Sequence, residues 1–259
     1  MQRILFALTL LCSLSFYGQN NAVSAGEKLL FTASYNISGI LTDLAEVSME
    51  TSEVKTSKTT LLRLKCSAAT YSQWDGFFKI RDLYESYVSP TTLIPYLYKR
   101  DINEGSYYKF MKYTYNHKDN TVNTLQRKKK KGGDTWDENK IITIKSGTRD
   151  IVSSLYTIRT FNFKNMAVGN SKKFIIVIDR EEIMASVTLL GKEFLQTNIG
   201  KKECYKLAIA ASKTDVLKGQ NSNLLWLTAD ENKVPVYARF KIAVGNGELK
   251  LKSASGLRN

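Results

Sequence analysis

The clearest pattern in this chain is a strict alternation of apolar and polar positions near its C-terminal end. The even-numbered positions from 234 to 244 are all apolar: Val234, Val236, Ala238, Phe240, Ile242 and Val244. A period of two residues over eleven positions predicts a β-strand with one buried face. Residues 224–228, LLWLT, precede a turn-like ADENK and are predicted to form the antiparallel partner of this strand.

The same alternation occurs earlier in the chain. Phe31, Ala33 and Tyr35 share one strand face, and residues 106–125 indicate two strands around a turn at 117–120. Residues 172–179 and 186–197 predict two more strands. No repeat of fixed length is present, so the pattern does not support a propeller or a solenoid.

One segment, RDIVSSLYTIRTF, departs from this rhythm. Ile151, Leu155 and Ile158 are spaced as on one face of a helix, and Asp150 precedes them as a good N-cap. We therefore predict a mainly β protein: an antiparallel, strongly curved sheet or partly closed β-roll or barrel with one short helix.

Aromatic residues are abundant, with 14 tyrosines and 11 phenylalanines, which suits half-buried strands. Between residues 107 and 115 they fall on both faces of one predicted strand. A curved sheet lined in this way can hold an acyl chain or a partner segment. The candidate ligand-binding residues are Tyr107, Phe110, Met111 and Tyr113. The alternative is a strand that is simply buried on both faces.

The N-terminal residues have the three-part layout of a signal peptide: a basic head with Arg3, an apolar run from Ile4 to about Tyr17, and a polar, small-residue stretch. The apolar run is shorter than the roughly 20 residues that a spanning helix needs. We predict a signal peptide within residues 1–25, cleaved between 18 and 25, and a single β-rich domain over 26–259. No later run is long enough to span a membrane, so a periplasmic or secreted protein is expected.

The chain carries a net charge of +14, and its most charged stretch is RKKKKGGD at residues 127–134. Export excludes chromosomal DNA as a partner. The glycines place this run on the loop side of a hairpin, where it is either a solvated loop or a contact with anionic lipid or polysaccharide. The candidate contact residues are Arg127, Lys128, Lys129, Lys130 and Lys131.

Two cysteines, Cys66 and Cys204, follow the predicted signal peptide, and an oxidising compartment permits them to form a disulfide. Their strand positions differ, because Cys66 is in step with apolar Leu64 whereas Cys204 is in step with Lys202 and Lys206. The alternative to a disulfide is therefore one buried thiol and one exposed thiol.

Few catalytic chemistries have the residues they need here. The only histidine, His117, lies in the turn-like NHKDN and is predicted to be solvated. A Ser-His-Asp triad or a histidine-based zinc site is improbable with one imidazole. The sequence has no glycine-rich phosphate loop or calcium-loop motif, so we predict no cofactor and no metal.

Carboxylates are the remaining enzymatic candidates. Two predicted neighbouring strands, joined at Ser89-Pro90, carry Asp82, Glu85, Asp101 and Glu104. Two carboxylates about 5–10 Å apart can hydrolyse a glycosidic bond. The alternative is structural, because Arg81 and Arg100 are adjacent and can form cross-strand ion pairs.

Three stretches taken together resemble a known family. They are FFKIRDLYESYVSPTTLIPYLYKRDINEGSYYK, DIVSSLYTIR and WLTADENKVPVYARFKIAVG. In this order they resemble domain-of-unknown-function family 3108 of exported bacterial proteins, over about residues 29–251. The resemblance implies a mostly antiparallel β protein of the periplasm or cell surface, and no established activity. The FYGQ ending of the leader resembles signal peptides of the Bacteroidetes.

Two functional hypotheses follow. The first is a non-catalytic binding or structural protein of the cell envelope, with a lipid-like apolar ligand or an envelope partner. The second is a carboxylate-dependent hydrolase acting on an envelope polysaccharide. The first predicts an apolar groove, and the second predicts that the four acids converge in an open cleft.

Overall fold

The computed structural model describes residues 19–37, 39–129, 133–212, 223–242 and 245–259. The predicted signal peptide up to residue 18 lies outside these residues, as do Lys130 and Lys131 of the basic run.

One antiparallel sheet contains all fourteen strands of the described residues. They are β1 (Lys28–Ile37), β2 (Ile40–Lys55), β3 (Thr60–Thr70), β4 (Arg81–Val88), β5 (Pro95–Glu104), β6 (Tyr107–Asn116), β7 (Thr121–Lys129), β8 (Thr135–Thr143), β9 (Ser171–Ile178), β10 (Glu181–Thr197), β11 (Gly200–Ala211), β12 (Leu224–Thr228), β13 (Pro235–Ile242) and β14 (Gly245–Ser255). Two meanders, β1 to β8 and β9 to β14, join where β1 pairs with β14, so β8 and β9 are the sheet edges.

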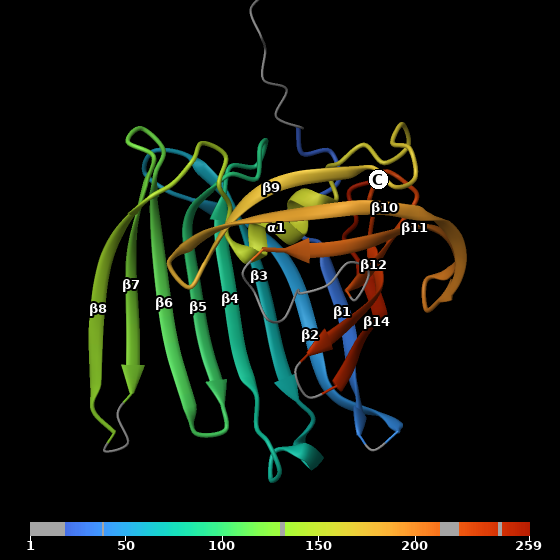
Figure 1. Ribbon diagram of the computed structural model, residues 1–259, viewed down its shortest axis with the longest axis horizontal. Helices are drawn as coiled ribbons and strands as arrows, with labels where there is room; N and C mark the ends of the chain where they lie inside the picture. Colours follow the sequence, from blue (N-terminus) through green and yellow to red (C-terminus); the bar gives the residue numbers. More distant parts are fainter. Residues whose placement is uncertain (1–18, 38, 130–132, 213–222, 243–244) are drawn as a thin grey trace, which may run out of the picture.

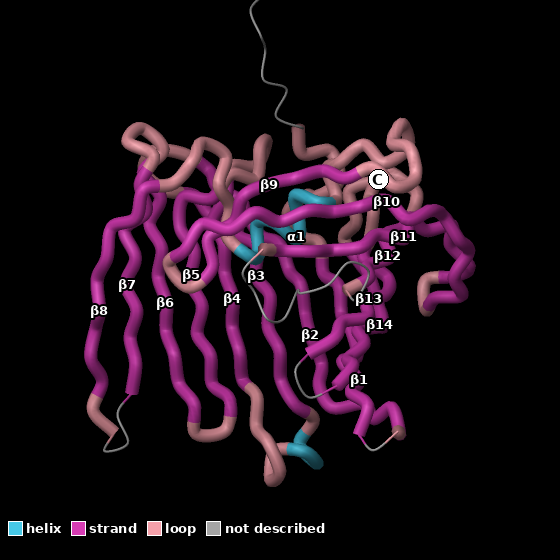
Figure 2. The backbone as a smooth tube through the Cα atoms, in the orientation of Figure 1, coloured by secondary structure: helices cyan, strands magenta, loops and turns pink. Residues whose placement is uncertain are grey.

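The described residues also form one α-helix, α1 (Ile151–Ile158), and a short 3-10 turn, η1 (Ser72–Trp74). The predicted fold class is confirmed, and the predicted strands correspond to β1, β6, β7, β9, β10, β12 and β13. The sheet curls strongly, and the β9–β10 hairpin crosses its concave face with α1 between the two layers (Figures 1 and 2).

The helix begins where the sequence predicted. Asp150 and Ser153 form a reciprocal capping box, in which the Ser153 N–H donates to Asp150 Oδ1 over 2.7 Å. Ser86 of β4 donates its hydroxyl to Asp150 Oδ2 over 2.6 Å and so ties the cap to the sheet. All helix residues except Ile151 and Leu155 are buried, because β3, β4 and β9 pack around α1.

The tip of the β9–β10 hairpin closes the roll through side chains. Asp179 and Arg180 both have positive φ, at 47° and 69°, as a tight two-residue hairpin turn requires. The Arg180 guanidinium contacts Glu138 of β8, and Asp179 forms an ion pair with Lys109 of β6 at 2.8 Å. The two ends of the sheet therefore meet through ion pairs instead of a backbone ladder.

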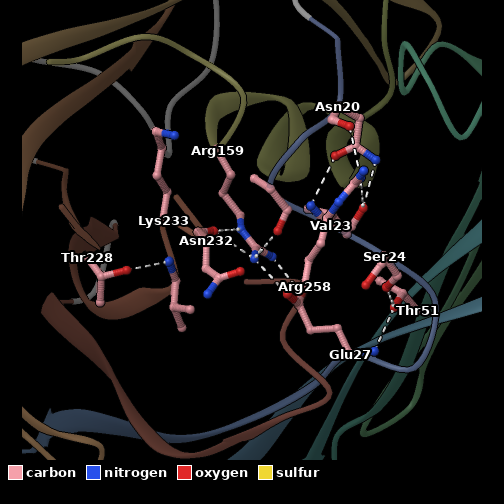
Figure 3. A network of polar contacts seen from close by, with 12 residues as sticks. Asn20, Val23, Ser24, Glu27, Thr51, Arg159, Thr228, Asn232, Lys233 and Arg258 are labelled. Atoms are coloured by element: carbon pink, nitrogen blue, oxygen red, sulfur yellow. Dashed lines mark hydrogen bonds and ion pairs between the residues drawn. The ribbon is translucent and has the colours of Figure 1, made fainter. Parts of the chain in front are cut away.

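A fully buried ion pair fixes the other end of α1. Arg159, at the helix C-cap, donates to both carboxylate oxygens of Glu27 over 2.6 and 2.7 Å, and both side chains are 0% exposed. The Arg159 guanidinium also donates to the carbonyl oxygens of Ala22 and Asn232 (Figure 3). Every charge in this network has partners, which is the condition under which a buried ion pair is tolerated.

Residues 20–24 belong to this buried network and to the main core. Ala22 and Val23 are 0% and 1% exposed, and Asn20 donates to the carbonyls of Val23 and Pro90 (Figure 3). The packed part of the chain therefore includes residues ahead of the expected domain start at residue 26.

Candidate functional site

An apolar groove on the concave face is lined by residues of β1, β2, β3, β13 and the β3–β4 connection, and this connection lies at the lower edge of the sheet in Figure 1. The groove encloses about 520 Å³. The groove is lined by Ala33, Ser34, Tyr35, Leu44, Ala45, Thr70, Trp74, Phe77, Phe78, Ile80 and Phe240. Nine of these eleven residues are aliphatic or aromatic, so the groove suits an apolar ligand.

Small side chains create the floor of the groove. Ala33 of β1 pairs directly with Ala45 of β2, which in turn pairs with Thr70 of β3. Three adjacent strands thus carry short side chains at one level, and space is left above the sheet. Because alternate side chains share one face of a strand, this row of short side chains forms a hollow, next to the register shift between Ala33 and Ser34 in the β1–β2 pairing.

Phe240 of β13 forms one wall, and Gly247 of β14 makes its position possible. A Cβ atom on Gly247 would lie only 2.4 Å from the Phe240 ring. Any residue with a Cβ atom at position 247 would require the Phe240 ring to move. The position of this wall of the groove therefore depends on both Phe240 and Gly247.

The lip of the groove is the aromatic connection between β3 and β4, residues 71–80. The Trp74 indole N–H donates to the Asp43 carbonyl over 3.0 Å, and the Gly105 N–H donates to the Lys79 carbonyl over 2.7 Å. These bonds hold the connection against β2 and the β5–β6 turn. The ring of Phe77 is nevertheless 86% exposed and that of Phe78 46% exposed.

Two of the candidate acids, Asp82 and Glu104, lie near the lining residue Ile80, although neither lines the groove. Ile80, a lining residue, bridges Glu104 across the strands, and Asp82 accepts the Asn103 N–H over 2.9 Å. Burial and the neighbouring Asp82 carboxylate raise the pKa of Glu104, whereas Arg100 opposes the shift.

The other two candidate acids lie on the convex face. Glu85 forms an ion pair with Arg63, and Asp101 accepts the side-chain N–H of Asn103 over 2.9 Å. Side chains alternate between faces, so Asp82 and Glu104 point one way while Glu85 and Asp101 point the other. The four acids therefore do not converge.

The neighbouring arginines do not form the ion pairs considered from the sequence. Arg81 pairs with Asp75 in the β3–β4 connection, and Arg100 pairs with Asp179 at the hairpin tip over 3.4 Å. Arg81 thereby stabilises the lip of the groove, and Arg100 helps to hold the hairpin over the sheet.

A family model described as "Protein of unknown function (DUF3108)" matches residues 31–252, which is most of the sequence. The chain belongs to the DUF3108 family. No curated protein matches it. Among solved structures, it is similar to the crystal structure of a beta-barrel-like protein of domain of unknown function DUF1849 from Brucella abortus, with a TM-score of 0.52 and 8% identity over 88% of this chain and 96% of that one. At this identity the likeness concerns the fold alone.

The ligand-binding residues predicted from the sequence lie elsewhere than the groove. Met111 and Tyr113 are buried in the main core, and the Tyr113 hydroxyl accepts the Arg180 N–H beneath the hairpin tip. Phe110 lies on the opposite face of β6 from these two, and Tyr107 is half exposed at the strand start. None of the four lines the groove, because β6 is separated from it by β4 and β5.

The basic run begins inside a strand. Arg127, Lys128 and Lys129 belong to β7, and two of them have acidic partners on β8. Arg127 contacts Asp137 through two bonds of 2.7 Å, and Lys128 contacts Glu138 at 3.2 Å. The loop assignment was wrong for these three residues, because cross-strand pairing compensates the charges of Arg127 and Lys128 and extends the hairpin through Lys129.

Both cysteines have free thiols. Cys66, on β3, packs against the main core, and burial raises its pKa to about 12. Cys204, on β11, is 0% exposed, and burial raises its pKa to about 11. The expectation of an exposed Cys204 was wrong, because β11 is covered on both faces: Cys204 packs in one hydrophobic cluster and Tyr205 in another.

His117 is also less solvated than predicted. Its Nε2 lies 2.7 Å from the Pro95 carbonyl oxygen, and its ring stacks on Tyr115 at 5.9 Å between ring centroids. It is half-buried and joins the β6–β7 turn to the start of β5.

The residues that the structure describes contain no cluster of three or more potential metal ligands. In the same residues, no helix is long and apolar enough to cross a membrane.

Proposed function

We propose that this DUF3108 protein is an exported, non-catalytic binding protein whose groove holds the acyl chain of a lipid-like ligand. The observation that supports the proposal is the lining of the groove, where nine of eleven residues are apolar or aromatic. Its volume of about 520 Å³ is within the range of about 300–1,000 Å³ typical of small-molecule sites. Each buried methylene of a ligand contributes about 0.8 kcal/mol.

The position of the acids favours binding over hydrolysis. A carboxylate hydrolase needs two acids flanking one substrate bond, whereas Glu85 and Asp101 lie on the convex face. Asp82 is 6% exposed and engages the Asn103 backbone, so it is occupied structurally.

Substitution of Ala33 by phenylalanine tests the proposal, because it fills the floor of the groove. The matched control is Ala69→Phe, which adds the same ring on the convex face of the same sheet. We expect the wild-type protein and the control to bind a fluorescent fatty acid, and Ala33→Phe to bind it at least about tenfold more weakly, as the loss of a few methylene contacts predicts.

Mass spectrometry of an organic extract gives an independent measurement on protein purified without added lipid. Co-purified lipid is expected with wild type and Ala69→Phe, and much less with Ala33→Phe. Lipid-free extracts from wild-type protein together with no fatty-acid uptake would contradict the proposal. Thermal melting of each variant separates a blocked groove from a misfolded chain.

A further inference from the structure

In an antiparallel meander, every second connection between strands lies at the same edge of the sheet. The β1–β2, β3–β4 and β5–β6 connections all lie at the lower edge in Figure 2, and the lip of the groove is the middle one. We define the lower rim as residues 39–41, 71–80 and 105–107. It borders the mouth of the groove, because Trp74, Phe77 and Phe78 belong to both.

The lower rim exposes large apolar side chains. Phe77 is 86% exposed and Ile40 70% exposed, and the rim also exposes Phe78, Leu41 and Tyr107. The opposite ends of the same strands, with as many strand residues included (residues 56–61, 89–96 and 117–122), expose one large apolar side chain, Tyr96, which is 44% exposed. The difference between two edges of one meander indicates that the lower rim contacts an apolar medium or partner.

We infer that the lower rim docks on an anionic lipid bilayer, with Phe77 and Ile40 inserted between the lipids. This inference rests on the proposed acyl-chain groove, whose mouth would then face the source of its ligand. The net charge of +14 favours an anionic surface. Exposed Lys79 follows Phe78 on the rim, and exposed Lys129 ends β7 at the same edge, so both are positioned to contact lipid headgroups.

Co-flotation with vesicles of equal parts phosphatidylcholine and phosphatidylglycerol tests the docking. The double variant Ile40→Ser/Phe77→Ser is expected to bind at least about tenfold more weakly than wild type, because two large apolar side chains no longer insert. The control is Phe194→Ser, which removes a similarly exposed ring, 65% exposed, from β10. Both variants should melt as wild type does, because the substituted side chains are exposed.

Unchanged vesicle binding by the double variant would overturn the inference, as would an equal loss in Phe194→Ser. Vesicle binding could also be abolished by high salt and yet be unaffected by the rim substitutions. That result would indicate general electrostatic attraction, and it would overturn the assignment of the lower rim as the docking surface. Vesicles of phosphatidylcholine alone should bind the wild type more weakly.

Two single variants separate this inference from the proposed function. Ile40 does not line the groove, so Ile40→Ser should weaken vesicle binding and leave uptake of soluble fatty acid unchanged. Ala33→Phe should weaken the uptake of soluble fatty acid and leave vesicle binding unchanged. If the protein takes up fatty acid but its vesicle binding does not depend on the rim, only the docking inference is overturned. If vesicle binding depends on the rim but the protein takes up no fatty acid, only the proposed function of the groove is overturned.

Discussion

The upper and lower halves of the concave face are built on the same strands but differ in what covers them. The upper half lies beneath α1 and the β9–β10 hairpin, and it contains a buried polar network around Arg159 and Asp150. Within the described part of the chain, no α-helix covers the lower half, which ends in the apolar groove and its exposed aromatic lip.

Side-chain size along single strands accounts for the difference. On β1 the inward residues pass from Leu29 and Phe31 in the upper half to Ala33 in the groove. On β2 they pass from Met49 to Ala45. One sheet thus supplies a packed half, which provides stability, and an open half that contains the groove. Substitutions in the upper half should therefore affect folding, and those in the lower half should affect binding.

The largest expected effect is loss of the buried ion pair in the upper half. Arg159→Met leaves the Glu27 carboxylate buried without its cation, and we expect a loss of about 3–5 kcal/mol in the free energy of unfolding. The measurement is chemical denaturation of the purified variant. The double variant Arg159→Met/Glu27→Leu removes both charges and should recover most of the loss. Equal destabilisation by the single and double variants would show that packing, and not charge, is decisive.

A smaller, pH-dependent effect is expected at the helix cap. Burial raises the pKa of Asp150 to about 6, above the value of about 3.9 expected in the unfolded chain. Between these values the folded state binds the proton more tightly than the unfolded state, so the contribution of this group to stability falls as the pH rises from about 4 to 6.

Asp150→Asn removes this titration and retains a side-chain acceptor for the cap. The stability of the variant relative to wild type should rise by about 2–3 kcal/mol between pH 4 and pH 7, as a pKa shift of about two units implies. Denaturation curves at both pH values measure this change. A relative stability that is independent of pH would contradict a raised pKa for Asp150.

The sequence predicted the elements better than the site. Alternation over residues 234–244 and the Asp150 cap depend on local chemistry; β13 formed over Pro235–Ile242, positions 243 and 244 lie outside the described residues, and α1 formed behind Asp150. The groove depends on pairings between distant strands, which bring Ala33, Ala45 and Phe240 together, so no local pattern marked it. Cys204 shows the same limit, because only the tertiary structure reveals that β11 is covered on both faces.

Some of the site was nevertheless accessible from the sequence. The parity of positions 82, 85, 101 and 104 separates the acids into two faces once the strands are assigned, and it argues against their convergence. The adjacent Phe77 and Phe78 in a polar connection were a signal of an exposed aromatic lip. The aromatic residues of β6 suggested a ligand site, but a strand covered by a hairpin also needs large apolar side chains, and Met111 and Tyr113 are buried in the core.

Photo-crosslinking with a fatty acid that carries a diazirine near its methyl end tests the central claim most directly. After irradiation and digestion, mass spectrometry locates the labelled residues. Binding in the groove predicts labels concentrated at Leu44, Phe240 and the 71–80 connection, with labelling lost in Ala33→Phe and retained in Ala69→Phe. Labels concentrated on β6 between Tyr107 and Tyr113, or spread over the convex face, would contradict the groove as the binding site.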